Sequence, residues 1–137
     1  MINARILVIE DDKFLRRACD VSLRKRGFTV LTAVDGEEGI RQALSGSPDL
    51  ILLDMLMPRL TGIETLEILK RDEKTRHIPV VILSNSSIEA DVQRAKALGA
   101  VGYLVKASLS LRELGDRVIG FLEQAGMDLG TPQDPPR

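Results

Sequence analysis

Five short apolar segments alternate along the chain with stretches whose apolar residues recur every three or four positions. The apolar segments cover residues 5–9, 28–33, 50–53, 79–83 and 101–105. Short segments rich in Val, Ile and Leu favour β-strands, and the uniformly apolar third segment is typical of a strand buried on both faces of a sheet. The pattern therefore predicts five strands.

Apolar stripes with helical spacing separate these segments. They are Leu15, Ala18, Cys19 and Leu23; Ile40, Ala43 and Leu44; Ile63, Leu66 and Leu69; Ile88, Val92 and Ala95; and Leu111, Leu114, Val118, Phe121 and Leu122. Asp12 is suited to cap the first helix, and Ser110 with Glu113 forms a capping box before the last. Five strand–helix units in alternation predict an α/β fold, in which helices cover both faces of a parallel sheet.

The helical pattern ends near residue 124, where the composition shifts to Gly, Pro and Asp. We expect one domain over residues 1–124, because the whole chain has the length of one ordinary domain. Residues 131–137 hold three prolines and no apolar periodicity. Residues 125–137 are therefore predicted to be a flexible C-terminal tail.

Composition narrows the kinds of partner. The chain has 19 basic and 20 acidic residues and a formal net charge of −1, so no overall field attracts nucleic acid or anionic lipid. No apolar run approaches the roughly 20 residues that span a bilayer, and no signal peptide is evident. The single Cys19 excludes an internal disulfide and suits a reducing compartment. We expect a cytoplasmic protein that binds neither membrane nor nucleic acid directly.

Polar residues that are capable of catalysis or metal binding follow the predicted strands. Glu10 and Asp11 follow the first strand, Asp54 the third, Ser84 the fourth and Lys106 the fifth. Ligands of open α/β sheets bind beyond the carboxyl ends of the strands, so these side chains are candidates for one site.

Carboxylates gathered in one pocket repel one another, which raises the pKa of at least one of them. A hard divalent cation removes this cost, and Mg²⁺ usually binds through one or two carboxylates plus phosphate oxygens. Lys106 suits a phosphoryl oxygen, but a plain ion pair with Asp54 is an equally simple interpretation. A hydroxyl at Ser84 adds a donor, although serines after strands are common in turns.

The chain resembles the receiver domain of bacterial response regulators over about residues 4–124. The matching motifs are Ile-Leu-Val-Ile-Glu-Asp-Asp at 6–12, Asp-Met-Leu-Met-Pro-Arg-Leu-Thr-Gly at 54–62, Leu83-Ser84, and Tyr-Leu-Val-Lys at 103–106. Each motif alone is weak, but all four occur in order and on the expected elements. The resemblance implies a doubly wound, flavodoxin-like sheet of strand order 2-1-3-4-5.

The resemblance also assigns residues to a phosphorylation site. It implies that Asp54 is the phosphoryl acceptor and that Lys106 contacts the phosphoryl group. Mg²⁺ is the implied cofactor, bound by Glu10, Asp11 and Asp54 together with the backbone carbonyl of Leu56. Of the acidic pair, Asp11 is the implied direct ligand.

The implied switch consists of Ser84, whose hydroxyl follows the phosphoryl group, and Tyr103, whose ring turns inward after phosphorylation. Two positions depart from the family pattern. Ala107 stands where many members have proline, so a cis-proline turn is absent. Asn85 replaces a residue that is usually small, which could narrow access to the phosphoryl site.

We therefore expect a phosphoacceptor that catalyses only its own phosphorylation and dephosphorylation. The implied donor is a sensor histidine kinase, a histidine phosphotransfer protein or a small phosphodonor, and the implied output is a downstream protein. The alternatives are a phosphorelay shuttle and an interaction module that keeps the fold without phosphorylation.

Two classes of enzyme fit less well. Phosphatases of the haloacid dehalogenase type carry a second aspartate two residues after the nucleophile, where this chain has Leu56. A dinucleotide-binding protein requires a glycine-rich turn after the first strand, and residues 10–13 are acidic and contain no glycine.

Overall fold

The computed structural model of the chain describes residues 3–85 and 88–129. The elements, in chain order, are β1 (Arg5–Ile9), α1 (Lys13–Lys25), β2 (Thr29–Ala33), α2 (Gly36–Gly46), β3 (Leu50–Asp54), α3 (Gly62–Arg71), β4 (Val80–Ser84), α4 (Glu89–Ala97), β5 (Gly102–Val105), a 3-10 helix η1 (Lys106–Ser108) and α5 (Leu111–Gln124). All five predicted strand–helix units are present. None of the helices in the described ranges combines the length and apolarity needed to cross a membrane.

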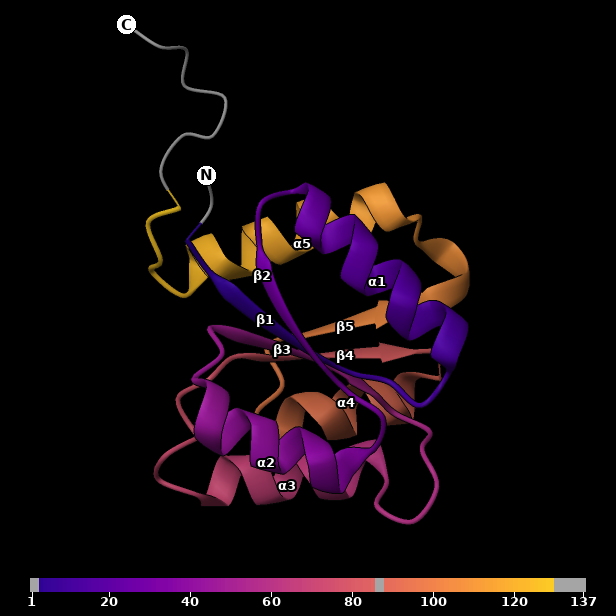
Figure 1. Cartoon of the computed structure of the whole chain (residues 1–137). Coiled ribbons are helices and arrows are strands. Elements are labelled where there is room, and N and C mark those ends of the chain that lie inside the picture. The colour runs from indigo at the N-terminus through magenta and orange to yellow at the C-terminus, as the bar shows by residue number, and fades with distance from the viewer. Residues whose placement is uncertain (1–2, 86–87, 130–137) are drawn as a thin grey trace, which may run out of the picture.

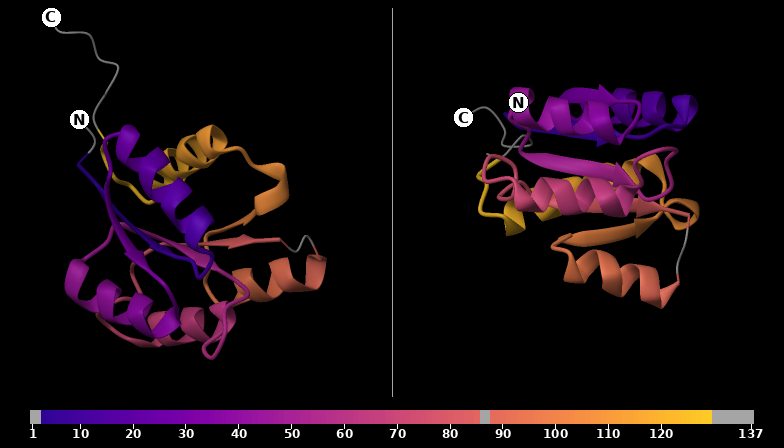
Figure 2. Two further views of the ribbon diagram at one scale, coloured as in Figure 1. Left: turned by 45° about the vertical axis from the view of Figure 1, so that its right-hand side comes forward. Right: turned by 90° about the horizontal axis from the view of Figure 1, so that it is seen from below.

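The five strands form one parallel sheet in the order β2-β1-β3-β4-β5. Helices α1 and α5 cover one face, and α2, α3 and α4 cover the other (Figure 1). Figure 2 shows the same two helical layers from other sides. From β1 the chain first adds β2 on one side of the sheet and then adds β3, β4 and β5 on the other side. The reversal creates a topological switch point between β1 and β3. The predicted fold class and strand order are confirmed.

The uniformly apolar third strand serves two separate cores. Leu50 and Leu52 pack in the cluster beneath α1 and α5. Ile51 and Leu53 pack in the cluster against α2, α3 and α4. Because successive side chains of a strand point to opposite faces, both faces of β3 must be apolar. Burial on both sides fixes the strand's position and, with it, Asp54 at its end.

Helix α1 begins immediately after the acidic residues that follow β1. Asp12 is its N-cap, and its Oδ1 accepts hydrogen bonds from the backbone N–H groups of Phe14 and Leu15. At α5, Ser110 and Glu113 form the predicted capping box. Such caps satisfy N–H groups that have no partner inside a helix. The N-cap of α1 is therefore set two residues after Glu10.

The predicted apolar stripe of the fourth helix is only partly correct. Ile88 is the residue before the first turn of α4 and its side chain is exposed, Val92 is half-buried, and Ala95 is buried. Since Ile88 does not have helical backbone geometry, it does not share the face that the spacing assigned to it. Among the described residues of α4, only Ala95 anchors the helix in the core.

The chain after α5 returns to the domain instead of leaving it at residue 125. The backbone N–H of Met127 donates to Leu122 O at 3.0 Å, and Leu129 is 7% exposed within the cluster beneath α1 and α5. Residues 125–129 therefore extend the packed domain beyond the boundary predicted from sequence. The rest of the predicted tail, residues 130–137, lies outside the described residues, and its flexibility stays a prediction.

Candidate functional site

Three charged side chains, from the ends of three different strands, meet at the carboxyl edge of the sheet. Lys106 Nζ, after β5, lies 3.0 Å from Asp54 Oδ1 and 2.9 Å from Glu10 Oε1. Glu10 is 1% exposed and Asp54 is 4% exposed. Buried charges are costly unless they are paired. The structure therefore brings Glu10, Asp54 and Lys106 together, as the strand-end argument predicts.

Asp11 completes an acidic cluster at this edge. Glu10, Asp11 and Asp54 each offer one carboxylate oxygen, and these oxygens lie within 4.8 Å of one another. Asp11 is the exposed member, so the cluster opens to solvent on its side.

Glu10 retains capacity to accept a ligand contact. Its Oε2 accepts a hydrogen bond from the backbone N–H of Asp12 at 3.1 Å. Its Oε1 is buried and makes no hydrogen bond with any described residue, because the nearby Lys106 ammonium is in ion-pair range but not aligned to donate. Lys106 thus compensates the charge of this oxygen without satisfying it fully as a hydrogen-bond acceptor. Oxygen donors of this kind fit a hard cation such as Mg²⁺.

The site raises the pKa of Asp54 to about 7. Burial is the largest cause, the neighbouring carboxyl groups of Asp11 and Glu10 add to it, and Lys106 opposes it. The predicted repulsion among carboxylates is thus present, but desolvation of Asp54 contributes more. For Lys106, burial lowers the pKa, and the contacts with Glu10 and Asp54 outweigh this effect, so its pKa is raised and the ammonium form is favoured.

The loop from β3 to α3 is held close beneath Asp54. The backbone N–H of Gly62 donates to Met55 O at 3.0 Å, and a Cβ at Gly62 would lie 2.3 Å from Asp54 O. Only glycine allows this approach without displacing the backbone of Asp54. Leu56 in this loop is exposed, and its N–H lies 3.4 Å from Asp54 Oδ1. Metal binding by the Leu56 carbonyl stays a prediction.

An ion pair missed in the sequence analysis ties this loop to the rest of the domain. The Arg59 guanidinium contacts the carboxylate of Asp35, the N-cap of α2. Arg59 has a φ of 65°, a conformation that is uncommon for residues other than glycine. No feature of the sequence identified this backbone conformation or Asp35 as the partner.

The predicted switch residues lie on two neighbouring strands, Ser84 at the end of β4 and Tyr103 in β5. Ser84 is fully buried at the end of β4, which runs between β3 and β5. Tyr103 is half-buried and packs against the core beneath α4. Asn85 is exposed. No peptide bond within the described ranges is cis, so the bond into Ala107 is trans, as expected for a residue other than proline.

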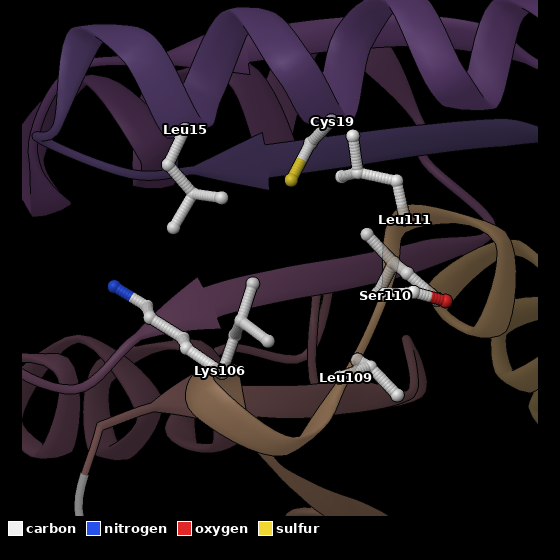
Figure 3. Close-up of a pocket in the computed structure, with 8 residues that line it drawn as sticks. Leu15, Cys19, Lys106, Leu109, Ser110 and Leu111 are labelled. Carbon is white, nitrogen blue, oxygen red and sulfur yellow. The ribbon is translucent and has the colours of Figure 1, made fainter.

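A cavity of about 30 Å³ lies behind Lys106, between α1 and the segment that leads into α5. Leu15 and Cys19 point into it from α1, and Lys106 and Leu109 line its other side (Figure 3). The apolar stem of Lys106 can pack along this wall while its ammonium stays with the carboxylates. Burial raises the pKa of the Cys19 thiol to about 12, so this cysteine is a core residue and no nucleophile.

Relatives of known name match most of the chain. The alkaline phosphatase synthesis transcriptional regulatory protein PhoP of Bacillus subtilis is 34% identical over 124 residues, which cover 90% of this chain and 50% of that protein. The transcriptional activator protein PfeR of Pseudomonas aeruginosa is 38% identical over 92% of this chain and 40% of that protein. Protein PilG of Pseudomonas aeruginosa is 32% identical over 74% of this chain and 76% of that protein. The chain thus spans about half or less of the two transcriptional regulators.

Solved structures and a family model agree with these relatives. The Vibrio cholerae chemotaxis protein CheY4 superposes with a TM-score of 0.81 at 28% identity and covers 85% of this chain and 97% of that one. The receiver domain of the Francisella response regulator 1452 gives a TM-score of 0.81 at 30% identity, over 89% of this chain and 98% of that one. The family model of the response regulator receiver domain matches residues 6–119. The chain therefore belongs to the receiver domains of two-component response regulators.

Proposed function

We propose that this receiver domain accepts a phosphoryl group on Asp54. The observation that carries the proposal is the environment of that carboxylate. Asp54 is 4% exposed, shares an acidic cluster with Glu10 and Asp11, and lies 3.0 Å from the Lys106 ammonium. A buried carboxylate surrounded by two others is an expensive arrangement for stability alone. It suits a nucleophile whose charge is compensated by cations during reaction.

The proposed step is an in-line displacement at phosphorus. A carboxylate oxygen of Asp54 forms the new O–P bond, and the bond from phosphorus to the donor breaks with its electron pair leaving on the donor atom. Acetyl phosphate releases acetate in this way, while phosphohistidine releases its imidazole nitrogen, which takes up a proton. Phosphoryl transfer depends chiefly on positioning and on stabilising the charge of the equatorial oxygens.

Glu10, Asp11 and Asp54 are the proposed side-chain ligands of Mg²⁺, together with the backbone carbonyl of Leu56. When bound, the cation supplies the positive charge that neutralises the phosphoryl oxygens. The buried Oε1 of Glu10 supports this assignment, because it makes no hydrogen bond with the described residues. The open side of the cluster at Asp11 leaves space for water and for a phosphodonor.

Lys106 has a different proposed role before and after the reaction. Before it, the ammonium pairs with Asp54 and Glu10 and favours the ionised form of Asp54. After it, the same ammonium contacts a phosphoryl oxygen, and the Ser84 hydroxyl moves to donate to another. Because both groups are already at the strand ends, the contacts require only local motion.

The proposed output is a population shift between two packings of the α4–β5 surface. Phosphorylation adds charge at one point, and motion of Ser84 frees space into which the half-buried Tyr103 turns. Helix α4 suits such a change, since Ala95 alone among its described residues is buried. The recipient of this signal is proposed to be a downstream protein.

The proposed phosphodonor protein is a sensor histidine kinase or a histidine phosphotransfer protein. Phe14 lies at the start of α1, next to the acidic loop formed by residues 10–12, and is 84% exposed. It is a suitable apolar contact for the phosphodonor protein. A nearly balanced charge and a free Cys19 support a cytoplasmic protein that recognises proteins in preference to nucleic acid.

Intact-mass measurement after incubation with acetyl phosphate tests the proposal. We expect one added phosphoryl group in MgCl₂ and none in EDTA. The Asp54→Asn variant should remain unmodified, and the Asp20→Asn variant, which alters an acidic residue of α1 outside the cluster, should be modified like the wild type. A folded wild-type protein that takes up no phosphoryl group would contradict the proposal and favour an interaction module.

A further inference from the structure

Arg16 binds the backbone of the acidic loop from the second turn of α1. Its Nη1 donates to Glu10 O at 2.9 Å and lies 3.4 Å from Asp11 O. The side chain is half-buried, and it forms no ion pair with any residue in the described ranges. Its guanidinium is therefore directed at the carbonyls of the two residues whose carboxylates belong to the acidic cluster.

The rest of the loop is fixed by its own side chains. Glu10 Oε2 accepts from Asp12 N, and Asp12 Oδ1 caps α1 by accepting from the N–H groups of Phe14 and Leu15. These contacts fix the end of the loop at α1. Arg16 adds a contact from outside the loop to the peptide units of Glu10 and Asp11, which set the direction of both side chains.

The positive charge of Arg16 does not account for its place here. A guanidinium near three carboxylates lowers the affinity of the same carboxylates for a cation, since like charges repel. A neutral donor would avoid this penalty. The feature that favours arginine is the reach and planarity of its donor group, which can contact two carbonyl oxygens at once.

We propose that Arg16 is a positioning residue for the metal site: it holds the carbonyls of Glu10 and Asp11 so that both carboxylates face Asp54. This inference rests on the proposed Mg²⁺ binding and adds a residue to it. Residues that orient metal ligands typically change metal affinity by about 10–100-fold when they are removed. The expected effect of Arg16 therefore falls on cation affinity.

The positioning role and a purely electrostatic role predict opposite changes in the Mg²⁺ affinity of Arg16→Ala. If Arg16 acts only through its charge, Arg16→Ala should bind Mg²⁺ more tightly than the wild type. If it positions the loop, Arg16→Ala should bind Mg²⁺ about tenfold more weakly. Arg16→Lys retains the charge and can still donate to a carbonyl, but it lacks the planar guanidinium, so it should recover part of the lost affinity.

Titration calorimetry of each intact chain with MgCl₂ alone provides the test, with thermal melting of each variant in EDTA to verify that it is folded. Arg17→Ala is the matched control, because Arg17 is the next residue of α1, carries the same charge and is exposed. It should bind Mg²⁺ as the wild type does or slightly more tightly.

Equal or tighter Mg²⁺ binding by Arg16→Ala would overturn the positioning role while leaving the proposed function intact. Weaker binding that Arg16→Lys does not recover at all would also overturn it. A wild-type chain that binds no Mg²⁺ would instead contradict the proposed function itself, and the positioning role with it.

Discussion

Lys106 Nζ lies 3.0 Å from Asp54 Oδ1, although β4 lies between β3, which ends at Asp54, and β5, which Lys106 follows. The same ammonium lies 2.9 Å from Glu10 Oε1. One cation thus compensates two buried carboxylates at the carboxyl edge of the sheet. Its removal should affect both the resting site and the proposed phosphoryl transfer.

We expect Lys106→Ala to slow phosphorylation by acetyl phosphate by about 100-fold at saturating MgCl₂. Loss of one preorganised charge or donor at a developing oxyanion typically costs about 10²–10³ in rate. Mg²⁺ binding measured by calorimetry should persist, since Lys106 supplies no metal ligand. Lys96→Ala, which alters an exposed lysine of α4, serves as the control. An unchanged rate in Lys106→Ala would exclude the proposed contact with the phosphoryl group.

The raised pKa of Asp54 predicts a pH dependence of folding in metal-free protein. The pKa is about 7 in the folded chain and about 3.9 in an unfolded one. Between these values the folded state binds more protons than the unfolded state, so the free energy of unfolding falls as pH rises from about 4 to about 7. Asp54→Asn lacks this contribution. The free energy of unfolding of the variant should therefore rise relative to that of the wild type over the same pH range.

Urea unfolding in EDTA at a series of pH values measures this difference. The stability curves of wild type and Asp54→Asn should diverge as pH rises and run parallel above about 8, where Asp54 is ionised in both states. Curves that stay parallel throughout would mean that Asp54 titrates as an ordinary aspartate.

Gly62→Ala should destabilise the protein and disturb the site. Its Cβ would lie 2.3 Å from Asp54 O and 2.7 Å from Met55 Cα, so the backbone that carries Asp54 must move. We expect a loss of about 1–3 kcal/mol, as for other overpacked positions, together with weaker Mg²⁺ binding.

Gly120→Ala is the control for this substitution. Gly120 lies within α5, and a Cβ there meets no atom within 4 Å. Alanine at this position should stabilise the protein by about 0.5–1 kcal/mol, as in helix interiors generally. Chemical denaturation measures the change in the free energy of unfolding of both variants. If this change had the same sign in both, the close approach of Gly62 to Asp54 would not explain the effect of Gly62→Ala.

Leu129→Ala should lower the free energy of unfolding by about 2 kcal/mol, the lower range for a leucine in a core. The physical reason is that Leu129 is buried with the cluster beneath α1 and α5. Phe14→Ala, at an exposed side chain, should change stability by less than about 0.5 kcal/mol. A negligible effect at Leu129 would return residues 125–129 to the tail that the sequence predicts.

The fold could be predicted because its signals are local. The apolar run at 50–53 requires a strand buried on both faces, and caps at Asp12 and Ser110 mark where helices begin. Four charged members of the site could also be predicted, since each lies at or just after the carboxyl end of a strand of one parallel sheet. The grouping of Glu10, Asp11, Asp54 and Lys106 follows from the positions of the strand ends alone.

Contacts between distant segments could not be predicted in this way. The contact of Arg59 with Asp35 and the burial of Leu129 depend on how loops return to the domain, which has no periodic signature. Ile88 was assigned to a helical stripe because spacing alone does not show where a helix starts. The donation by Arg16 to Glu10 O involves a backbone acceptor, and such acceptors are the same at every position of a sequence.

The central claim is that Asp54 is the phosphoryl acceptor, and chemical mapping of the modified residue tests it most directly. The wild type is phosphorylated with acetyl phosphate in MgCl₂, reduced with borohydride, which converts an aspartyl phosphate to homoserine, and digested for peptide mass mapping. The account predicts homoserine at position 54 alone, and none in EDTA. Homoserine at another aspartate, or phosphorylation that persists in Asp54→Asn, would contradict it.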